Sequence, residues 1–480
     1  MRILRSKSLV VVLVLTVSFL GGCDYLNPAD VSPPETAKKT SKPPAPVVVD
    51  GTRSSYADIV EKSSPAVVQI AAVFKQEESR GGFGPSSRGP RMPSRGAGSG
   101  VIVSKDGTIL TNHHVIDKAE RITVEMSDGT THTAEMVGSD KPSDLAVIKI
   151  KGDDYPFLKL GDSDEVRVGD IVLAIGNPLG IGQTVTSGII SAKGRTTGLG
   201  DPSSFQDFLQ TDAPINQGNS GGALVNVKGE LIGINSQILS RSGGSIGIGF
   251  AIPSNMATSV MDQLIKTGKV RRGMLGINIQ NTTPEIRKQY GIEGNGGTIV
   301  SGVKEGGAAE KAGIKVGDVI TEFNGEEIDD GNSLRNKVAA TMPGTEIKIS
   351  LIRDKKKQEI KVSLDEYDVE GLQASNDARP DEDAPEKSGR LGINVQPITP
   401  ELASRYRIPS DIKGLVVSSV DPQGPAAEAG LREGDVIREV NRELIESTED
   451  MRRAVDEAGE GAMLLLINRQ GRTAFLTIRP

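Results

Sequence analysis

The chain has 480 residues, 36% of them hydrophobic, and a formal net charge of −7 at pH 7. This length suggests about three domains, and the apolar content is sufficient for globular cores. The acidic balance argues against nucleic acid or another polyanion as a partner. Only 3% of the residues are aromatic and none is tryptophan, so we expect the cores to be built from aliphatic side chains.

The N-terminus has the pattern of an export signal. Arg2, Arg5 and Lys7 precede an apolar run at residues 9–20, which is too short to span a bilayer comfortably. We predict that residues 1–22 form a signal peptide that is removed on export. Residues 23–54 contain proline, lysine and threonine without apolar periodicity, and we expect them to form a disordered tether.

Cys23 is the only cysteine in the chain and follows Leu-Gly-Gly at residues 20–22. This segment resembles a bacterial lipobox, in which the cysteine is lipidated and becomes the first residue of the mature protein. A single cysteine cannot form an internal disulfide, and several acyl chains on one residue anchor a protein stably to a membrane. The alternative is ordinary cleavage nearby, which would leave an unmodified thiol.

Residues 55–269 have the pattern of a β-barrel domain. Short apolar segments bounded by Gly, Asp and Ser recur roughly every ten residues, for example at residues 122–126, 171–175 and 231–234. The pattern stops between residues 75 and 98, which are rich in glycine and arginine and are expected to form a solvated loop. After Pro253, we expect Ser254 to cap a helix that ends at Gly268. One face of this helix carries Val260, Met261, Leu264 and Ile265.

Three segments of this domain carry residues suited to nucleophilic catalysis. Two of the three histidines lie in Thr-Asn-His-His-Val at residues 111–115, Asp144 opens an apolar strand pattern, and Ser220 lies in Gly-Asn-Ser-Gly-Gly at residues 218–222. A serine hydroxyl becomes a strong nucleophile beside a base that a third group orients. The order His, Asp, Ser is that of chymotrypsin-type barrels. We therefore predict a triad of His114, Asp144 and Ser220.

The glycines around Ser220 suit an oxyanion hole. Glycine at position 218 permits backbone angles that a side chain forbids, so the N–H groups of Gly218 and Ser220, with Asn219 between them, can converge on one oxygen atom. In isolation the segment also fits a glycine-rich turn between strands. Its combination with His114 and Asp144 favours the catalytic interpretation.

Together these motifs resemble those of the bacterial HtrA/Deg proteases. The matching segments are residues 111–115, Ser-Asp-Leu-Ala-Val at 143–147, residues 218–224 and Ile-Gly-Ile-Gly-Phe-Ala-Ile-Pro at 246–253. The resemblance implies a mostly β, trypsin-like double barrel that cleaves unfolded or misfolded envelope proteins through an acyl-enzyme, without metal or cofactor, on the periplasmic side. It assigns the base to His114 and not to His113, because the family histidine directly precedes the valine.

The resemblance also bears on regulation and assembly. Trypsin-like enzymes have an aspartate before the catalytic serine, which pairs with a new N-terminus after zymogen cleavage, whereas this chain has the uncharged Asn219. Activation by a liberated N-terminus is therefore not expected, and the resemblance implies control by loop ordering. It further implies trimers or multiples of trimers, with residues 75–98 contacting neighbouring subunits.

Ile234, Ile248 and Phe250 are expected to line the primary specificity pocket. All three are apolar, and no aspartate is present where a basic substrate side chain would need one. We therefore expect small or medium aliphatic residues before the cleaved bond, in line with the family's habit of cutting after Val or Ala. The alternative, that these residues belong to the barrel core, fits the sequence equally well.

The C-terminal part is an internal repeat. Leu-Gly-Ile-Asn occurs at residues 275–278 and 391–394, and Gly-Asp-Val-Ile at 317–320 and 434–437. Each unit has about 100 residues and is thus a domain, not a solenoid repeat. Both units, at residues 270–365 and 389–480, resemble HtrA-type PDZ domains, small β-barrels or sandwiches with two helices. Residues 366–388 are acidic and are expected to form a flexible linker that lets the second unit move independently.

The Leu-Gly-Ile loop before an edge strand can present N–H groups to the C-terminal carboxylate of a peptide that adds as a further strand. We predict this role for Met274, Leu275, Gly276 and Ile277 in the first unit and for Arg390, Leu391, Gly392 and Ile393 in the second. The expected partners are thus unfolded proteins and C-terminal peptides. A chaperone or peptide-sensing scaffold is the rival function, but an inactive protease would be expected to have lost a triad residue.

We predict that the mature chain begins at a lipidated Cys23, because a lone cysteine after an export signal has no disulfide partner. Mass spectrometry of the N-terminal peptide from native membranes should find acyl chains on this residue. An unmodified cysteine, or a mature start elsewhere, would remove the membrane anchor.

Overall fold

The computed structural model describes residues 48–49, 52–53, 55–74, 94–178, 182–197, 204–240, 243–292, 294, 296–367, 390–459 and 461–479. The predicted signal peptide, Cys23 and all but the first two residues of the predicted linker lie outside these ranges. A short antiparallel hairpin, β1 (Val48–Val49) with β2 (Thr52–Arg53), precedes the first domain.

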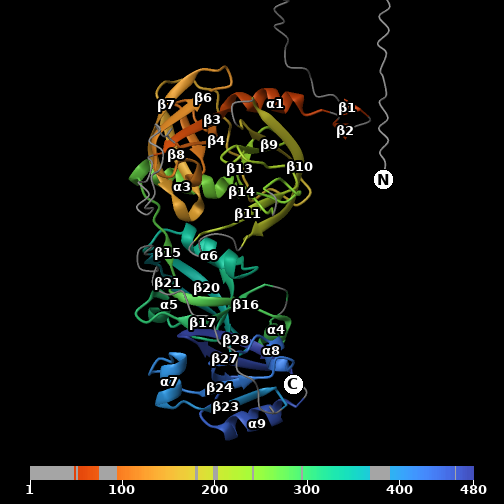
Figure 1. Ribbon diagram of the computed structural model, residues 1–480, viewed down its shortest axis with the longest axis vertical. Helices are drawn as coiled ribbons and strands as arrows, with labels where there is room; N and C mark the ends of the chain where they lie inside the picture. Colours follow the sequence, from red (N-terminus) through yellow and green to blue (C-terminus); the bar gives the residue numbers. More distant parts are fainter. Residues whose placement is uncertain are drawn as a thin grey trace, which may run out of the picture. The chain divides into compact units, whose positions relative to one another are not determined.

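Two closed six-stranded antiparallel barrels form the first domain, as expected from the spacing of its apolar segments (Figure 1). The first consists of β3 (Val67–Phe74), β4 (Ser94–Ile102), β5 (Thr108–Thr111), β6 (Ala119–Glu125), β7 (Thr131–Asp140) and β8 (Leu145–Ile150). The second consists of β9 (Ile171–Gly176), β10 (Thr184–Arg195), β11 (Phe208–Thr211), β12 (Ala223–Asn226), β13 (Leu231–Ile238) and β14 (Gly249–Pro253). Closure leaves no open sheet edge in either barrel.

The two barrels share one apolar core. A single buried cluster includes Ile70 and Ile148 of the first barrel together with Ile175 and Ala223 of the second. Aliphatic side chains dominate it, in agreement with the low aromatic content. Because close-packed interiors resist displacement, this shared core fixes one barrel against the other, and loops from both can contribute to one site.

Two helical segments flank the barrels. α1 (Ala57–Ser63) and the 3₁₀ turn η1 (Ser64–Ala66) precede β3. α3 (Ser254–Thr267) follows β14 and packs against β7, β8 and β13 (Figure 1). Helix α3 ends as predicted, because Gly268 adopts the left-handed conformation with φ 71°, which glycine accommodates without strain.

The start and the apolar face of α3 differ in part from expectation. Ser254 is the first helical residue and does not cap the helix; its hydroxyl donates to the carbonyl of Gly161 at 2.7 Å. The cap position is held by Pro253. Val260 and the other predicted apolar positions are buried, except Ile265, which is 51% exposed.

Each repeat folds as one open antiparallel sheet. The first repeat contains β16 (Ile277–Asn281), β17 (Thr298–Val303), β18 (Val319–Phe323), β19 (Glu326–Glu327), β20 (Glu346–Arg353) and β21 (Lys356–Ser363), with α4 (Pro284–Tyr290), α5 (Ala308–Lys311) and α6 (Gly331–Ala340). A separate antiparallel pair, β15 (Gly273–Met274) with β22 (Asp365–Glu366), joins the start and the end of the first repeat. The second contains β23 (Ile393–Pro397), β24 (Leu415–Val420), β25 (Val436–Val440), β26 (Glu443–Leu444), β27 (Met463–Arg469) and β28 (Arg472–Ile478), with α7 (Pro400–Tyr406), α8 (Pro425–Glu428) and α9 (Thr448–Ala458).

The repeats thus have three helices each where we expected two, because a single helical turn, α5 or α8, follows the second strand of the sheet.

The structure explains why the Gly-Asp-Val-Ile motif contains an aspartate. Asp318 is 1% exposed and accepts two hydrogen bonds from Arg353, at 2.7 and 2.6 Å. Asp435 is also 1% exposed and accepts two from Arg469, both at 2.6 Å. Both repeats therefore pair a buried aspartate with an arginine, and a buried carboxylate needs such a partner.

Residues of the second repeat contact the first repeat. Ile286, Tyr290 and Phe475 belong to one buried cluster that spans both repeats. The side chain of Gln280 donates to the carbonyl of Phe475 at 2.8 Å and accepts from its N–H at 3.0 Å. The acidic composition of the linker gave no information about this contact between folded surfaces.

Candidate active site

A single 3₁₀ turn positions Asp144. This turn, η2 (Lys141–Ser143), is capped by Asp140, whose carboxylate accepts a hydrogen bond from the N–H of Ser143 at 3.0 Å. Asp144 ends the turn in the left-handed conformation with φ 55° and directly precedes β8. Such a conformation is uncommon for a residue other than glycine and often marks a functional position.

The turn is clamped by a buried ion pair. Arg272, which follows α3, donates from Nη1 to Asp140 Oδ1 at 2.8 Å and from Nη2 to Oδ2 at 2.5 Å. The two side chains are only 6% and 7% exposed. Bidentate pairs of this kind are strong and geometrically specific. The residue that leads into the first repeat is therefore tied to the turn that carries Asp144.

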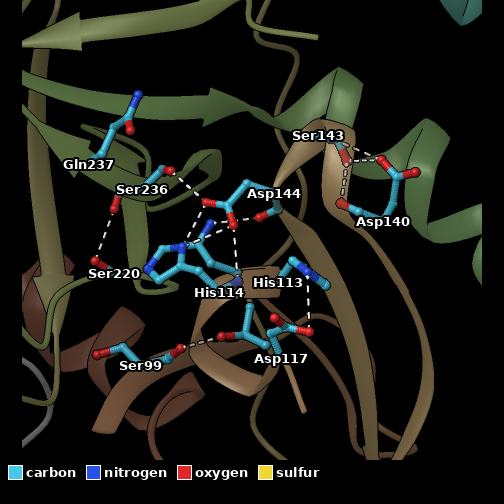
Figure 2. A network of polar contacts seen from close by, with 12 residues as sticks. Ser99, His113, His114, Asp117, Asp140, Ser143, Asp144, Ser220, Ser236 and Gln237 are labelled. Atoms are coloured by element: carbon cyan, nitrogen blue, oxygen red, sulfur yellow. Dashed lines mark hydrogen bonds and ion pairs between the residues drawn. The ribbon is translucent and has the colours of Figure 1, made fainter. Parts of the chain in front are cut away.

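His114 is oriented by Asp144. It lies on α2 (His113–Ile116), directly after β5 and Asn112. Its Nδ1 is 2.9 Å from each carboxylate oxygen of Asp144, and its N–H donates to Oδ1 at 3.1 Å (Figure 2). A carboxylate accepts only, so Nδ1 carries the proton and Nε2 is left as an acceptor. This is the tautomer that a general base requires.

His113 contacts Asp144 only through its backbone, whose N–H donates to the carbonyl of Asp144 at 3.1 Å. Its imidazole is directed elsewhere, with Nε2 3.6 Å from Asp117 Oδ1 (Figure 2). The segment that carries both histidines is helical. Consecutive helical side chains are about 100° apart, so the two imidazoles still diverge.

Ser220 comes from the second barrel, between β11 and β12, and joins the same network. Its hydroxyl donates to the carbonyl of Ser236 at 2.9 Å, and the Ser236 hydroxyl donates to Asp144 Oδ2 at 2.9 Å (Figure 2). The Ser220 proton is thus directed to Ser236 and not to His114. Catalytic hydrogen bonds often tighten only when substrate binds.

Sequence reasoning missed Ser236. It is 3% exposed and lies in β13, whose other buried residues are mostly apolar. Its hydroxyl and carbonyl connect the predicted nucleophile to the predicted orienting carboxylate. A single serine in an apolar strand carries no motif, so only the fold reveals this connection.

The predicted oxyanion loop has two available N–H donors. Gly218 has φ 98°, and a Cβ at this position would lie 2.4 Å from Pro178 Cβ, so glycine is needed here. Among the described residues, the N–H groups of Gly218 and Ser220 have no hydrogen-bond partner. The N–H of Asn219, which the sequence grouped with them, instead donates to the carbonyl of Asn216 at 3.0 Å. Asn219 therefore supplies no donor to the hole in this structure.

The predicted pocket residues lie mainly in the core, which is the alternative that the sequence allowed. Ile234 is 0% exposed within the shared cluster of the two barrels, so it has no surface with which to contact a substrate. Phe250 is 5% exposed and packs on Phe208 with ring centroids 5.7 Å apart. Ile248 is half-buried at the edge of the cluster. Of the three, Ile248 is the most exposed.

The predicted carboxylate loops have the same geometry in both repeats. Gly276 has φ 73°, and the carbonyls of Leu275 and Gly276 accept from the N–H groups of Ala309 at 2.9 Å and Lys304 at 2.8 Å. Met274, in β15, is half-buried, and Ile277 begins the edge strand β16. The N–H groups of Leu275 and Gly276 have no hydrogen-bond partner among the described residues.

The second repeat reproduces these contacts. Gly392 has φ 75°, and the carbonyls of Leu391 and Gly392 accept from Ala426 at 3.2 Å and Asp421 at 2.7 Å. Arg390 is exposed and Ile393 begins the edge strand β23. Both loops can therefore offer backbone donors beside an open edge strand, which is the arrangement that peptide addition requires.

Within the ranges described above, no group of three His, Cys, Asp or Glu side chains is arranged to hold a metal ion. No described helix is long and apolar enough to cross a bilayer. Because Cys23 and residues 1–22 lie outside these ranges, lipidation stays a prediction.

Three protein-family models match parts of the chain. Residues 98–234 match the family model of the trypsin-like peptidase domain. Residues 273–364 and 416–469 match two models of the PDZ domain. The two repeats are thus PDZ domains, as their sequence resemblance suggested.

Curated relatives extend over most of the chain. A probable periplasmic serine endoprotease, DegP-like, of Chlamydia trachomatis is 41% identical and covers 82% of this chain and 77% of its own length. The protein of the same description from Pseudomonas fulva is 39% identical over 88% of this chain and 93% of its own. Among solved structures, the HtrA-type protease AlgW with a tripeptide has a TM-score of 0.56 at 43% identity and covers 65% of this chain and 98% of its own.

We predict that His114→Ala removes proteolysis as completely as loss of the serine does, because of the two neighbouring histidines only His114 contacts the Asp144 carboxylate. His113→Ala should retain most activity, since its imidazole faces Asp117. Cleavage rates on an unfolded substrate decide between them, with thermal unfolding curves as the control for folding. If His113→Ala were the inactivating change, the base would be assigned to the wrong histidine.

Proposed function

Because this chain belongs to the HtrA/DegP-like family of periplasmic serine endoproteases, with a trypsin-like domain and two PDZ domains, we propose that it degrades unfolded or misfolded envelope proteins. The observation that supports the catalytic assignment is the network from Ser220 through Ser236 and Asp144 to His114. It brings residues of both barrels together and gives the His114 imidazole the carboxylate partner that orients a general base.

In the proposed mechanism, Ser220 Oγ attacks the carbonyl carbon of the substrate and its proton passes to Nε2 of His114. Asp144 stabilises the imidazolium that forms. The N–H groups of Gly218 and Ser220 bind the oxyanion of the tetrahedral intermediate. His114 then protonates the leaving amine, which departs with the C-terminal part of the substrate. Water, activated by His114, hydrolyses the acyl-enzyme and restores the Ser220 hydroxyl.

We further propose that the first PDZ domain captures the free C-terminus of a peptide and that this raises activity. The N–H groups around Leu275 and Gly276 support carboxylate binding, and the edge of β16 supports strand addition. The AlgW structures with a tripeptide and a decapeptide are of a related HtrA-type protease with bound peptides. The preference for aliphatic residues before the cleaved bond, with Ile248 at the pocket, is part of the same proposal.

Two contacts support transmission from this domain to the active site. Arg272 holds Asp140 and thereby the turn that carries Asp144. The side chains of Asn332 and Asn336, on α6, both donate to the carbonyl of Gln206 at 2.9 Å, close to the start of β11. α6 packs beside β16, so a peptide added at that edge would touch it. A ligand activates only if it favours the active arrangement over the resting one.

The lipid anchor at Cys23 and the assembly into trimers or multiples of trimers belong to this proposal as predictions from the sequence. An anchored enzyme would act on proteins at the surface of its membrane. The tether at residues 23–54 would set the distance between the protease domain and the membrane.

Replacing the nucleophile tests the proposed activity directly. We expect Ser220→Ala to lower the rate of casein degradation by at least about 1,000-fold, with an unchanged thermal unfolding midpoint. Undiminished degradation by the purified variant would refute the catalytic assignment. Retained suppression of aggregation by the inactive variant would indicate that the chain also has the rival chaperone function.

A peptide with a free C-terminal carboxylate should accelerate cleavage, whereas its amidated twin should not, because the loop N–H groups need an anionic oxygen. The two loop glycines offer matched variants in the full chain. Gly276→Val and Gly392→Val place a β-branched residue at φ 73° and 75°, where it is strained. We expect only Gly276→Val to abolish activation. Equal effects of the two peptides, or loss of activation in Gly392→Val alone, would contradict the proposal.

A further inference from the structure

Ser99 connects the first barrel to the loop of the nucleophile. It lies on β4, is 0% exposed and is close to Ser220 (Figure 2). Its hydroxyl donates to the carbonyl of Gly218 at 2.6 Å and accepts from the N–H of Asn177 at 2.8 Å. Its own N–H donates to the carbonyl of Ser220 at 2.8 Å. One residue therefore holds two carbonyl groups of the predicted oxyanion loop.

The first of these carbonyls belongs to the peptide plane of Gly218 and Asn219. A peptide unit is planar, so the direction of the Gly218 carbonyl sets that of the Asn219 N–H, which donates to Asn216. Because the Ser99 hydroxyl accepts from Asn177, its single proton is committed to Gly218. This plane is thus bonded on both sides and cannot rotate without losing two hydrogen bonds.

The second carbonyl belongs to the peptide plane of Ser220 and Gly221. Ser99 N–H holds its oxygen, and the Gly221 N–H donates to the carbonyl of Asn235 at 2.7 Å. The N–H of Ser220, a proposed oxyanion donor, belongs to the peptide that lies between these two fixed planes. Its direction therefore depends on contacts that Ser99 makes from the other barrel.

We propose that the Ser99 side chain is a positioning residue for the oxyanion hole. It acts by fixing the peptide after Gly218, and it touches neither substrate nor the reacting atoms. A hydroxyl is needed because the group must donate to one backbone atom and accept from another at once. The inference rests on the proposed serine protease mechanism and adds to it a residue outside the triad motifs.

The hydroxyl-deletion variant Ser99→Ala tests this role on an unstructured peptide substrate. Loss of one oxyanion donor lowers kcat by about 100- to 1,000-fold, and a misdirected donor should cost part of this. We expect kcat to fall about 10- to 100-fold with KM nearly unchanged. Ser63→Ala is the matched control, because Ser63 is also 0% exposed and its hydroxyl has no hydrogen-bond partner among the described residues. It should retain wild-type kcat.

The affinity for a boronic acid analogue of the substrate reports on the oxyanion hole itself, and a general loosening of the protein structure would not reproduce the expected change. The boron of the analogue forms a bond to Ser220 Oγ, the Ser220 proton passes to His114, and the anionic tetrahedral adduct places a boron-bound oxygen in the hole. Because such adducts resemble the transition state, affinity for the boronate should fall by the same factor as kcat in Ser99→Ala. Affinity for the corresponding carboxamide peptide, which forms no adduct, should not change.

Three results would overturn the assignment: kcat of Ser99→Ala within twofold of wild type, an equal fall in Ser63→Ala, or unchanged boronate affinity. If Ser99→Ala does not fold, Thr111→Val replaces it, since Thr111 Oγ1 donates to the Ser99 carbonyl at 2.8 Å. A smaller fall in kcat is then expected, and an unchanged kcat would overturn the assignment. An inactive wild-type enzyme, or an active Ser220→Ala variant, would instead refute the proposed function.

Discussion

The active-site geometry depends on the carboxylate of Asp144. This carboxylate accepts hydrogen bonds from the ring and the backbone of His114 and from the hydroxyl of Ser236. The backbone carbonyl of Asp144 accepts a further one from the N–H of His113. A negative charge that is partly withdrawn from water needs such donors. Both barrels contribute them, so the carboxylate also joins the barrels at the point where the proposed chemistry occurs.

The second support is the hydrogen bonding of the serine loop. Glycines allow this loop to adopt its backbone angles, but they do not by themselves select one arrangement, because glycine is conformationally permissive. The selection comes from contacts outside the loop, with Ser99 on one side and the carbonyl of Asn235 on the other. A motif of small residues supplies the possible conformations, and the surrounding barrels choose among them.

A third feature links the active site to peptide recognition. Arg272 and Asp140 form a buried pair between the entrance of the first PDZ domain and the turn of Asp144. Breaking such a pair leaves an uncompensated buried charge and costs about 3–5 kcal/mol. A displacement of Arg272 would therefore disturb the turn that orients Asp144 in the predicted triad. The second PDZ domain in turn contacts the first through a buried cluster that includes Tyr290 and Phe475.

The sequence by itself determined the double barrel and the repeat, and it predicted His114, Asp144 and Ser220 as one group, because motif chemistry and strand periodicity are local properties. It did not determine which N–H groups of the serine loop are available, that Ile234 lies in the core, or that α2 is helical at His113. Only the tertiary structure decided the parts played by Ser236, Ser99 and Arg272. Each is a common residue without a motif, and its contacts arise because close packing brings it against a segment that is distant in the chain.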